Sequence, residues 1–304
     1  QGLPQHLHGR LVYQAGSGIA HKVMARGLGV LPMEKQLEQR PANDAADSLE
    51  LSIQLSLQIS HHLAHMGLFE RALSLLELRL LGSPFDNRLI NACHHIQAQW
   101  RALPFALDDC RSGALMLLPL TEHYLHDFGW QYADPAISEL CNLPTFESNE
   151  HWLNWLAQSQ HEKGRYLLAV MHQKWGFIGS VSLEVFQGVG FFYYWLGADF
   201  QGMGFGPQAV NILLNMGQVY TGLDCCYAKV YAHNDASQKA IKKLGFSALQ
   251  ITAQAPFDNE CFYYLGPNKI KWQNWQELSW LLREQGSDME LAGAEGCLYM
   301  GATA

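Results

Sequence analysis

The chain has few basic residues and no long hydrophobic run. Its 304 residues include 20 Lys and Arg against 28 Asp and Glu, which gives a formal net charge of −8. A surface of this balance does not attract phosphate backbones, so the composition argues against nucleic acid as a principal partner. No apolar run reaches the roughly 18 residues that a membrane span needs. We therefore expect a cytoplasmic protein without a membrane span.

The cysteine content also fits a cytoplasmic protein. The seven cysteines are odd in number and irregular in spacing, so they do not form a disulfide framework. Cys225 and Cys226 are adjacent on a predicted strand and therefore point to opposite faces. We expect reduced thiols in a core, and a hydrophobic content of 48% is enough for two packed domains.

The segment Asp47–Trp100 has apolar residues at helical spacing and few strand signals. Four residues in it resemble one tetratricopeptide repeat, with Gly67 separating a first helix from a second. They are Gly67, Phe69, Ala72 and Pro84. A single repeat cannot bury its own apolar face, so we expect further helices at Asn87–Arg101 and Gly18–Arg26 to pack on it. Two roles stay open: a groove for a peptide or carrier protein, and a helical lid that dimerises the protein.

Histidines gather in the same helices. His61 and His65 are one helical turn apart, and His94 and His95 lie on a later helix. Only Cys93 supplements them at a suitable spacing, so we expect no metal site.

The most informative motif is Gln-Gly-Met-Gly-Phe-Gly at residues 201–206. It follows the apolar run Gly190–Leu196 and opens an amphipathic stretch that predicts a helix. Unpaired backbone N–H groups and the helix dipole converge at such a junction, which makes it a site for a pyrophosphate.

A second motif follows about thirty residues later. The predicted strand Tyr227–Tyr231 leads to Asn234, Ser237 and a helix that closes on Leu244-Gly245-Phe246. Together the two motifs resemble those of the GNAT acyl-CoA-dependent N-acyltransferases. In that resemblance Gln201, Gly204 and Gly206 fill the three defining positions of the acyl-CoA loop.

The resemblance extends over Gly113–Gly266 and implies an α+β fold with a mixed, mostly antiparallel sheet flanked by helices. The expected strands are Ala114–Leu120, Tyr166–His172, Phe177–Val185, Gly190–Leu196, Tyr227–Tyr231 and Glu260–Leu265. The expected helices are Thr121–Gly129, Pro135–Leu140 and Glu150–Gln160, with a tail helix at Lys269–Gln285. We therefore predict a small all-α domain at residues 1–110, the acyltransferase domain at 111–268, and a C-terminal helix and tail at 269–304.

The resemblance also implies what binds the donor. Family members hold the pyrophosphate and pantetheine of an acyl-CoA with the glycine loop and the following Asn motif, and need no metal. The residues expected to contact the donor here are Leu196, Gln201, Gly202, Met203, Gly204, Phe205, Gly206, Asn234, Ser237 and Lys239.

The catalytic residues are less regular. Family members often carry a Glu on the strand before the loop, but that strand here reads Phe191-Phe192-Tyr193-Tyr194, with Phe191, Tyr193 and Trp195 on one face. Many also carry a Tyr seven residues after the Asn, where this chain has Ile241. The candidate replacements are Glu184, Asp199, Tyr194 and Ser237.

We expect transfer of an acetyl or other acyl group from coenzyme A to a primary amine. Tyr194-Trp195-Leu196 before the loop resemble the branch that acetylates protein N-termini, which favours an amine of a peptide or protein. Two alternatives stay open. One is transfer of a longer acyl group from acyl-CoA or acyl carrier protein, and the other is a non-catalytic protein that binds acyl-CoA or a partner. A homodimer is compatible with each.

Overall fold

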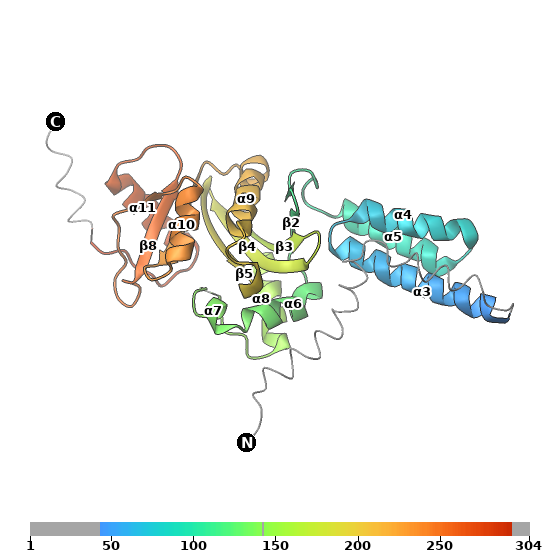
Figure 1. Ribbon diagram of the computed structural model, residues 1–304. Helices are drawn as coiled ribbons and strands as arrows, with labels where there is room; N and C mark the ends of the chain where they lie inside the picture. The colour runs from blue at the N-terminus through green and yellow to red at the C-terminus, as the bar shows by residue number, and fades with distance from the viewer. Residues whose placement is uncertain (1–42, 142, 294–304) are drawn as a thin grey trace, which may run out of the picture. The chain divides into compact units, whose positions relative to one another are not determined.

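The computed structural model describes residues 43–141 and 143–293, which divide into two compact units (Figure 1). The first unit contains α3 (Asn43–His65), α4 (Phe69–Gly82) and α5 (Asn87–Arg101). The break at Gly67, whose φ is 72°, and the helix at Asn87–Arg101 confirm two sequence predictions. The predicted helix Gly18–Arg26 lies outside the described residues. Assignment of this unit to the tetratricopeptide repeats stays a prediction.

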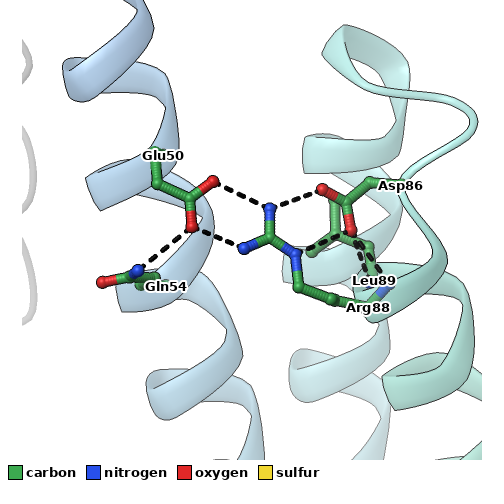
Figure 2. Close-up of polar contacts among 5 residues, drawn as sticks. All are labelled: Glu50, Gln54, Asp86, Arg88 and Leu89. Carbon is green, nitrogen blue, oxygen red and sulfur yellow. Dashed lines mark hydrogen bonds and ion pairs between the residues drawn. The ribbon is translucent and has the colours of Figure 1, made fainter.

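Apolar side chains between the three helices form the core of the first unit. Ala72, Leu76 and Leu89 are fully buried, and Ile96 is 2% exposed. The Arg88 guanidinium adds a surface link, because it pairs with Glu50 of α3 at 2.5 Å and with the Asp86 cap of α5 at 2.7 Å (Figure 2). The Arg88 and Glu50 side chains are 47% and 45% exposed, so solvent screens their attraction and the pair adds little to stability.

The second unit contains an eight-stranded sheet in the order β1-β2-β3-β4-β5-β6-β8-β7. The strands are β1 (Arg111–Ser112), β2 (Leu115–Pro119), β3 (Arg165–His172), β4 (Gly176–Phe186), β5 (Val189–Leu196), β6 (Cys225–Tyr231), β7 (Ser247–Ala248) and β8 (Glu260–Leu265). The pair β5/β6 is parallel, whereas β2/β3, β4/β5 and β6/β8 are antiparallel. This mostly antiparallel sheet flanked by helices confirms the predicted fold class, and the two-residue strands β1 and β7 were not predicted.

The helices of this unit flank both faces of the sheet. They are η1 (Glu122–Tyr124), α6 (Leu125–Tyr132), α7 (Pro135–Ser138), α8 (Asn149–His161), η2 (Ala198–Phe200), α9 (Phe205–Thr221), α10 (Asp235–Lys243) and α11 (Lys271–Glu284). In Figure 1, α9 lies on one side of β4 and β5, and α6 and α8 lie on the other. No helix in the described part of the chain is both long and apolar enough to cross a membrane.

Alternation along β5 sends its aromatic side chains to both faces, as predicted. Phe191 packs in the core that includes Leu278 and Leu281 of α11. Trp195 packs edge-on against Phe128 of α6, with ring centroids 4.9 Å apart. On the opposite face the Tyr194 ring lies against Gly206 of α9. The α6/α8 group and α11 therefore cover separate parts of one face, and α9 covers the other.

One carboxyl group in the α6 layer predicts a pH dependence of stability. Burial raises the pKa of Asp127 from 3.8 to about 6, so the folded protein binds this proton more tightly than the unfolded chain. The contribution of this tighter proton binding to the free energy of unfolding is complete below about pH 4 and is lost as the pH rises through about 6. We expect Asp127→Asn to raise the Tm by a few degrees at about pH 8 and to change it little at about pH 4. Equal shifts at the two pH values in thermal unfolding would contradict burial as the cause.

Candidate active site

The site begins where two parallel strands separate. The β5/β6 pairing runs only from Val189–Cys225 to Phe191–Tyr227. Beyond that point β5 stays paired with β4 up to Leu196, while β6 stays paired with β8 up to Tyr231. The sheet is therefore open between the last residues of β5 and β6, and backbone N–H and C=O groups on the facing edges are available to a ligand.

A glycine-rich turn carries the chain from β5 into α9. Gly202 and Gly204 adopt φ values of 75° and 83°, in the left-handed region that favours glycine. The Gln201 side chain donates from Nε2 to the Leu196 carbonyl at 3.1 Å and so ties the turn to the end of β5. A Cβ at Gly206 would lie 2.9 Å from the Tyr194 ring, so glycine is needed for the helix to pack there.

The N-terminus of α9 has the properties of an anion site. No side chain caps it, and the first residues of a helix have no intrahelical carbonyl to receive their N–H groups. The dipole of a 17-residue helix adds positive potential at the same point. Lys239 and Lys243 of α10 face the same cavity of about 260 Å³, and none of the described residues lining it is Asp or Glu. The cavity therefore fits a pyrophosphate, and we call it the donor cavity.

Most of the residues predicted to contact the donor line this cavity. They are Leu196, Gln201, Gly202, Gly204, Gly206, Asn234, Ser237 and Lys239. Met203 and Phe205, which were also predicted, do not line the donor cavity. The Met203 side chain is 54% exposed, and the Phe205 ring packs against His172. The Asn234 side chain caps α10 by accepting the Ser237 N–H at 3.1 Å.

A second cavity of about 240 Å³, the acceptor cavity, adjoins the donor cavity at the opening in the sheet. Both are lined by Leu140, Cys141, Tyr194, Trp195, Asn234 and Ser237. The shared residues place the two cavities on either side of one junction. A ligand reaching through the opening from the donor cavity would meet a ligand in the acceptor cavity at Tyr194 and Ser237.

Glu184 is the carboxylate of the acceptor cavity. It lies on β4 opposite Phe191, which is the last residue of β5 that pairs with β6, and it is 8% exposed. The Arg165 Nε lies 3.4 Å from Glu184 Oε1, and the Gln285 Nε2 donates to Glu184 Oε2. Burial raises the pKa of Glu184, and the Arg165 charge and the Gln285 hydrogen bond partly oppose this. A buried carboxyl group with a raised pKa is suited to proton transfer.

Two hydroxyl groups lie at the junction. Burial raises the pKa of Tyr194, so its hydroxyl stays protonated and is a hydrogen-bond donor at neutral pH. Contact with Ser237 opposes this rise in the pKa.

Asp199 is exposed in the turn after β5 and lines neither cavity. The structure therefore brings Glu184, Tyr194 and Ser237 together and leaves Asp199 outside. Ile241 lines the acceptor cavity at the position where the family often has Tyr.

Sequence reasoning missed several polar residues of the acceptor cavity. Lys229 of β6 forms a buried ion pair with Glu260 of β8 at 2.7 Å, and Arg165 starts β3 beside Glu184. A charged residue at a strand position that faces the core is unusual, so these residues could have been recognised in the sequence as candidates for the site. Gln285, at the end of α11, had no such signal, because a polar residue at a helix end is ordinary.

In the described residues no group of three or more His, Cys, Asp and Glu side chains is placed to hold a metal ion.

Comparison with known proteins finds a family model that matches the central part of the chain. Residues 114–247 match the family model described as acetyltransferase (GNAT) domain, which confirms the resemblance for that segment. The helical unit and α11 lie outside the match. No curated protein matches the chain.

Solved structures that resemble part of the chain include three acetyltransferases. Spermidine N-acetyltransferase from Vibrio cholerae, in complex with CoA and spermine, is 17% identical over 51% of this chain and 96% of its own, with a TM-score of 0.46. The ribosomal-protein-S5-alanine acetyltransferase from Vibrio fischeri is 16% identical over 52% and 96%, with a TM-score of 0.45. The microcin C7 self-immunity acetyltransferase, in complex with acetyl-CoA and AMP, is 19% identical over 51% and 94%, with a TM-score of 0.46.

Proposed function

We propose that this protein transfers an acyl group from coenzyme A to a primary amine. The observation that carries the proposal is the pair of cavities that meet at the opening between β5 and β6. One ends in an uncapped helix N-terminus with two lysines, and the other contains a buried carboxylate. The family match to residues 114–247 supports the same activity.

The donor would lie with its pyrophosphate at Gln201–Gly206 and its pantetheine along the open edge of β5. Backbone N–H groups at the start of α9 and the ammonium groups of Lys239 and Lys243 would bind the phosphates. The open strand edge offers hydrogen bonds to the amide groups of the pantetheine and an N–H donor to the thioester carbonyl. In this arrangement the reacting carbon would lie beside Tyr194 and Ser237.

The acceptor amine would enter the second cavity and attack the thioester carbon. The new C–N bond forms while Glu184 takes a proton from the amine, directly or through a water molecule. The C–S bond then breaks, and the thiolate leaves with the electron pair and receives a proton from the Tyr194 hydroxyl. Ser237, next to Tyr194, would hold that hydroxyl in place. We assign no role to Asp199, because it lines neither cavity.

Cavity size bears on the length of the acyl group. A volume of about 240 Å³ corresponds to about eight water molecules, and the acceptor shares it with the acyl group. This favours acetyl or another short acyl group over a fatty acyl chain. An amine of a peptide or protein is the acceptor we favour, and the homodimer and the cytoplasmic location stay predictions.

Ligand-dependent thermal unfolding tests donor binding. We expect free coenzyme A and acetyl-CoA to raise the Tm, because a ligand that binds only the folded state stabilises it by about 2.7 kcal/mol at one hundred times its Kd. Longer acyl-CoAs should raise the Tm no further, since the acyl group must fit the acceptor cavity. Sodium chloride at matched ionic strength is the control. A Tm that no acyl-CoA changes would contradict the proposed donor.

A further inference from the structure

Four buried polar atoms of the acceptor cavity have no hydrogen-bond partner among the described residues. They are Arg165 Nε, which lies 3.4 Å from Glu184 Oε1 without a hydrogen bond, and Ser182 Oγ, Trp195 Nε1 and Gln285 Oε1. Ser182 and Trp195 are 4% and 6% exposed, so bulk water does not satisfy them. A buried polar atom without a partner is costly, and where it lines a cavity a bound ligand can supply the missing bond.

Ser182, Trp195 and Gln285 belong to one wall of the cavity. Ser182 and Glu184 are two residues apart on β4 and therefore point to the same face. Ser182 pairs with Tyr193 across the strands, and Trp195 lies two residues beyond Tyr193 on the same face. Gln285 comes from the end of α11, and its Nε2 is held by Glu184, which fixes the amide so that Oε1 remains for a ligand.

The charges in the same cavity are already matched. Arg165 pairs with Glu162 at 2.6 Å and lies 3.4 Å from Glu184, and Lys229 pairs with Glu260 at 2.7 Å. A second ammonium on the acceptor would therefore find no free counter-charge and would lose its hydration. Besides Arg165 Nε, whose charge is shared with the two carboxylates, the atoms left for a ligand are one acceptor (Gln285 Oε1), one donor (Trp195 Nε1) and one hydroxyl (Ser182 Oγ).

We infer that this wall is a subsite for a neutral hydrogen-bonding group, an amide, next to the amine of the acceptor. An amide N–H would donate to Gln285 Oε1, and its carbonyl would accept from Trp195 Nε1 or the Ser182 hydroxyl. The inference rests on the proposed function and narrows it to amino-amide acceptors, the chemistry of a peptide N-terminus, over alkylamines and diamines. Gln285 is then a specificity-determining residue that lies outside the segment matched by the acetyltransferase (GNAT) family model.

The test compares three primary amines with acetyl-CoA as donor: alaninamide, butylamine and 1,4-diaminobutane. Release of the coenzyme A thiol gives kcat/KM for the full-length protein and for Gln285→Leu and Ser182→Ala. The amines differ in basicity, so the quantity compared is the ratio of wild type to variant for each amine. We expect each variant to lower kcat/KM for alaninamide by about tenfold more than for butylamine, because one hydrogen bond to the substrate is lost.

Controls keep this test separate from that of the proposed function. Gln276→Leu changes an exposed glutamine of the same helix and should leave all three ratios near one. An equal loss for all three amines, or a larger loss for the diamine, would overturn the subsite while leaving the transferase in place. If no amine reacts, thermal unfolding with alaninamide alone decides: a Tm rise that Gln285→Leu removes supports the subsite without the transferase, and no rise overturns it.

Discussion

A Gly204→Trp variant is expected to lose coenzyme A binding and still unfold cooperatively. Gly204 lines the donor cavity and precedes the first residue of α9, and an added Cβ there meets no atom within 4 Å. A tryptophan at this position would therefore extend into space that the pyrophosphate needs. Two hydrogen bonds from backbone N–H groups to a charged phosphate are worth about 1.5–3 kcal/mol each, so their loss predicts at least a hundredfold weaker binding.

The backbone conformation needs a matched control, because Gly204 has a φ of 83° and any other residue there is strained. Gly222 supplies it. It ends the same helix with a φ of 68°, and its added Cβ also meets nothing within 4 Å. Gly222→Trp should lower the Tm by a similar amount, since left-handed backbone costs about 1–2 kcal/mol in a non-glycine residue, yet keep the rise in Tm with coenzyme A. Normal coenzyme A binding by Gly204→Trp would show that the donor binds elsewhere.

Elements with strong local patterns were predictable from the sequence. The strand Glu260–Leu265 and the helix Asn87–Arg101 have the predicted bounds, because alternation and helical spacing report the burial of one face. The glycine turn was predictable because few residues other than glycine adopt the φ of Gly202 and Gly204. By contrast, β1 and β7 have two residues each, too few for any period to show.

The acceptor cavity was less predictable, because its residues are far apart in the sequence. Arg165, Glu184 and Gln285 come from β3, β4 and the end of α11, and Gln285 lies 101 residues from its partner Glu184. Local periodicity places each residue on an element but does not say which elements meet. Glu184 was named as a candidate from the family's missing carboxylate. Its neighbours required the strand order and the packing of α11 on the sheet.

A Glu184→Gln variant is expected to bind acetyl-CoA normally and to lose most of its acyl transfer. The amide keeps the shape of the side chain and cannot accept a proton from the amine. General base catalysis contributes about 10²–10⁴-fold, so kcat should fall in that range while the Tm rise with acetyl-CoA persists. Because Gln has a similar volume, and because burial already raises the pKa of Glu184, the fold should tolerate the change. Glu162→Gln is the control, since Glu162 is exposed and contacts the same Arg165.

The pH dependence distinguishes a proton acceptor from a residue that only shapes the cavity. The base form of Glu184 exists above its pKa, which burial raises from 4.5, so kcat/KM should fall as the pH drops through that raised value. Gln285 donates to the carboxylate and opposes the rise, so Gln285→Leu should move this acidic limb to higher pH. In Glu184→Gln the limb should disappear. If Glu184→Gln kept full activity and the acidic limb, proton transfer would belong to another group. If the wild type transferred no acyl group to any amine, the non-catalytic acyl-CoA-binding alternative would be favoured.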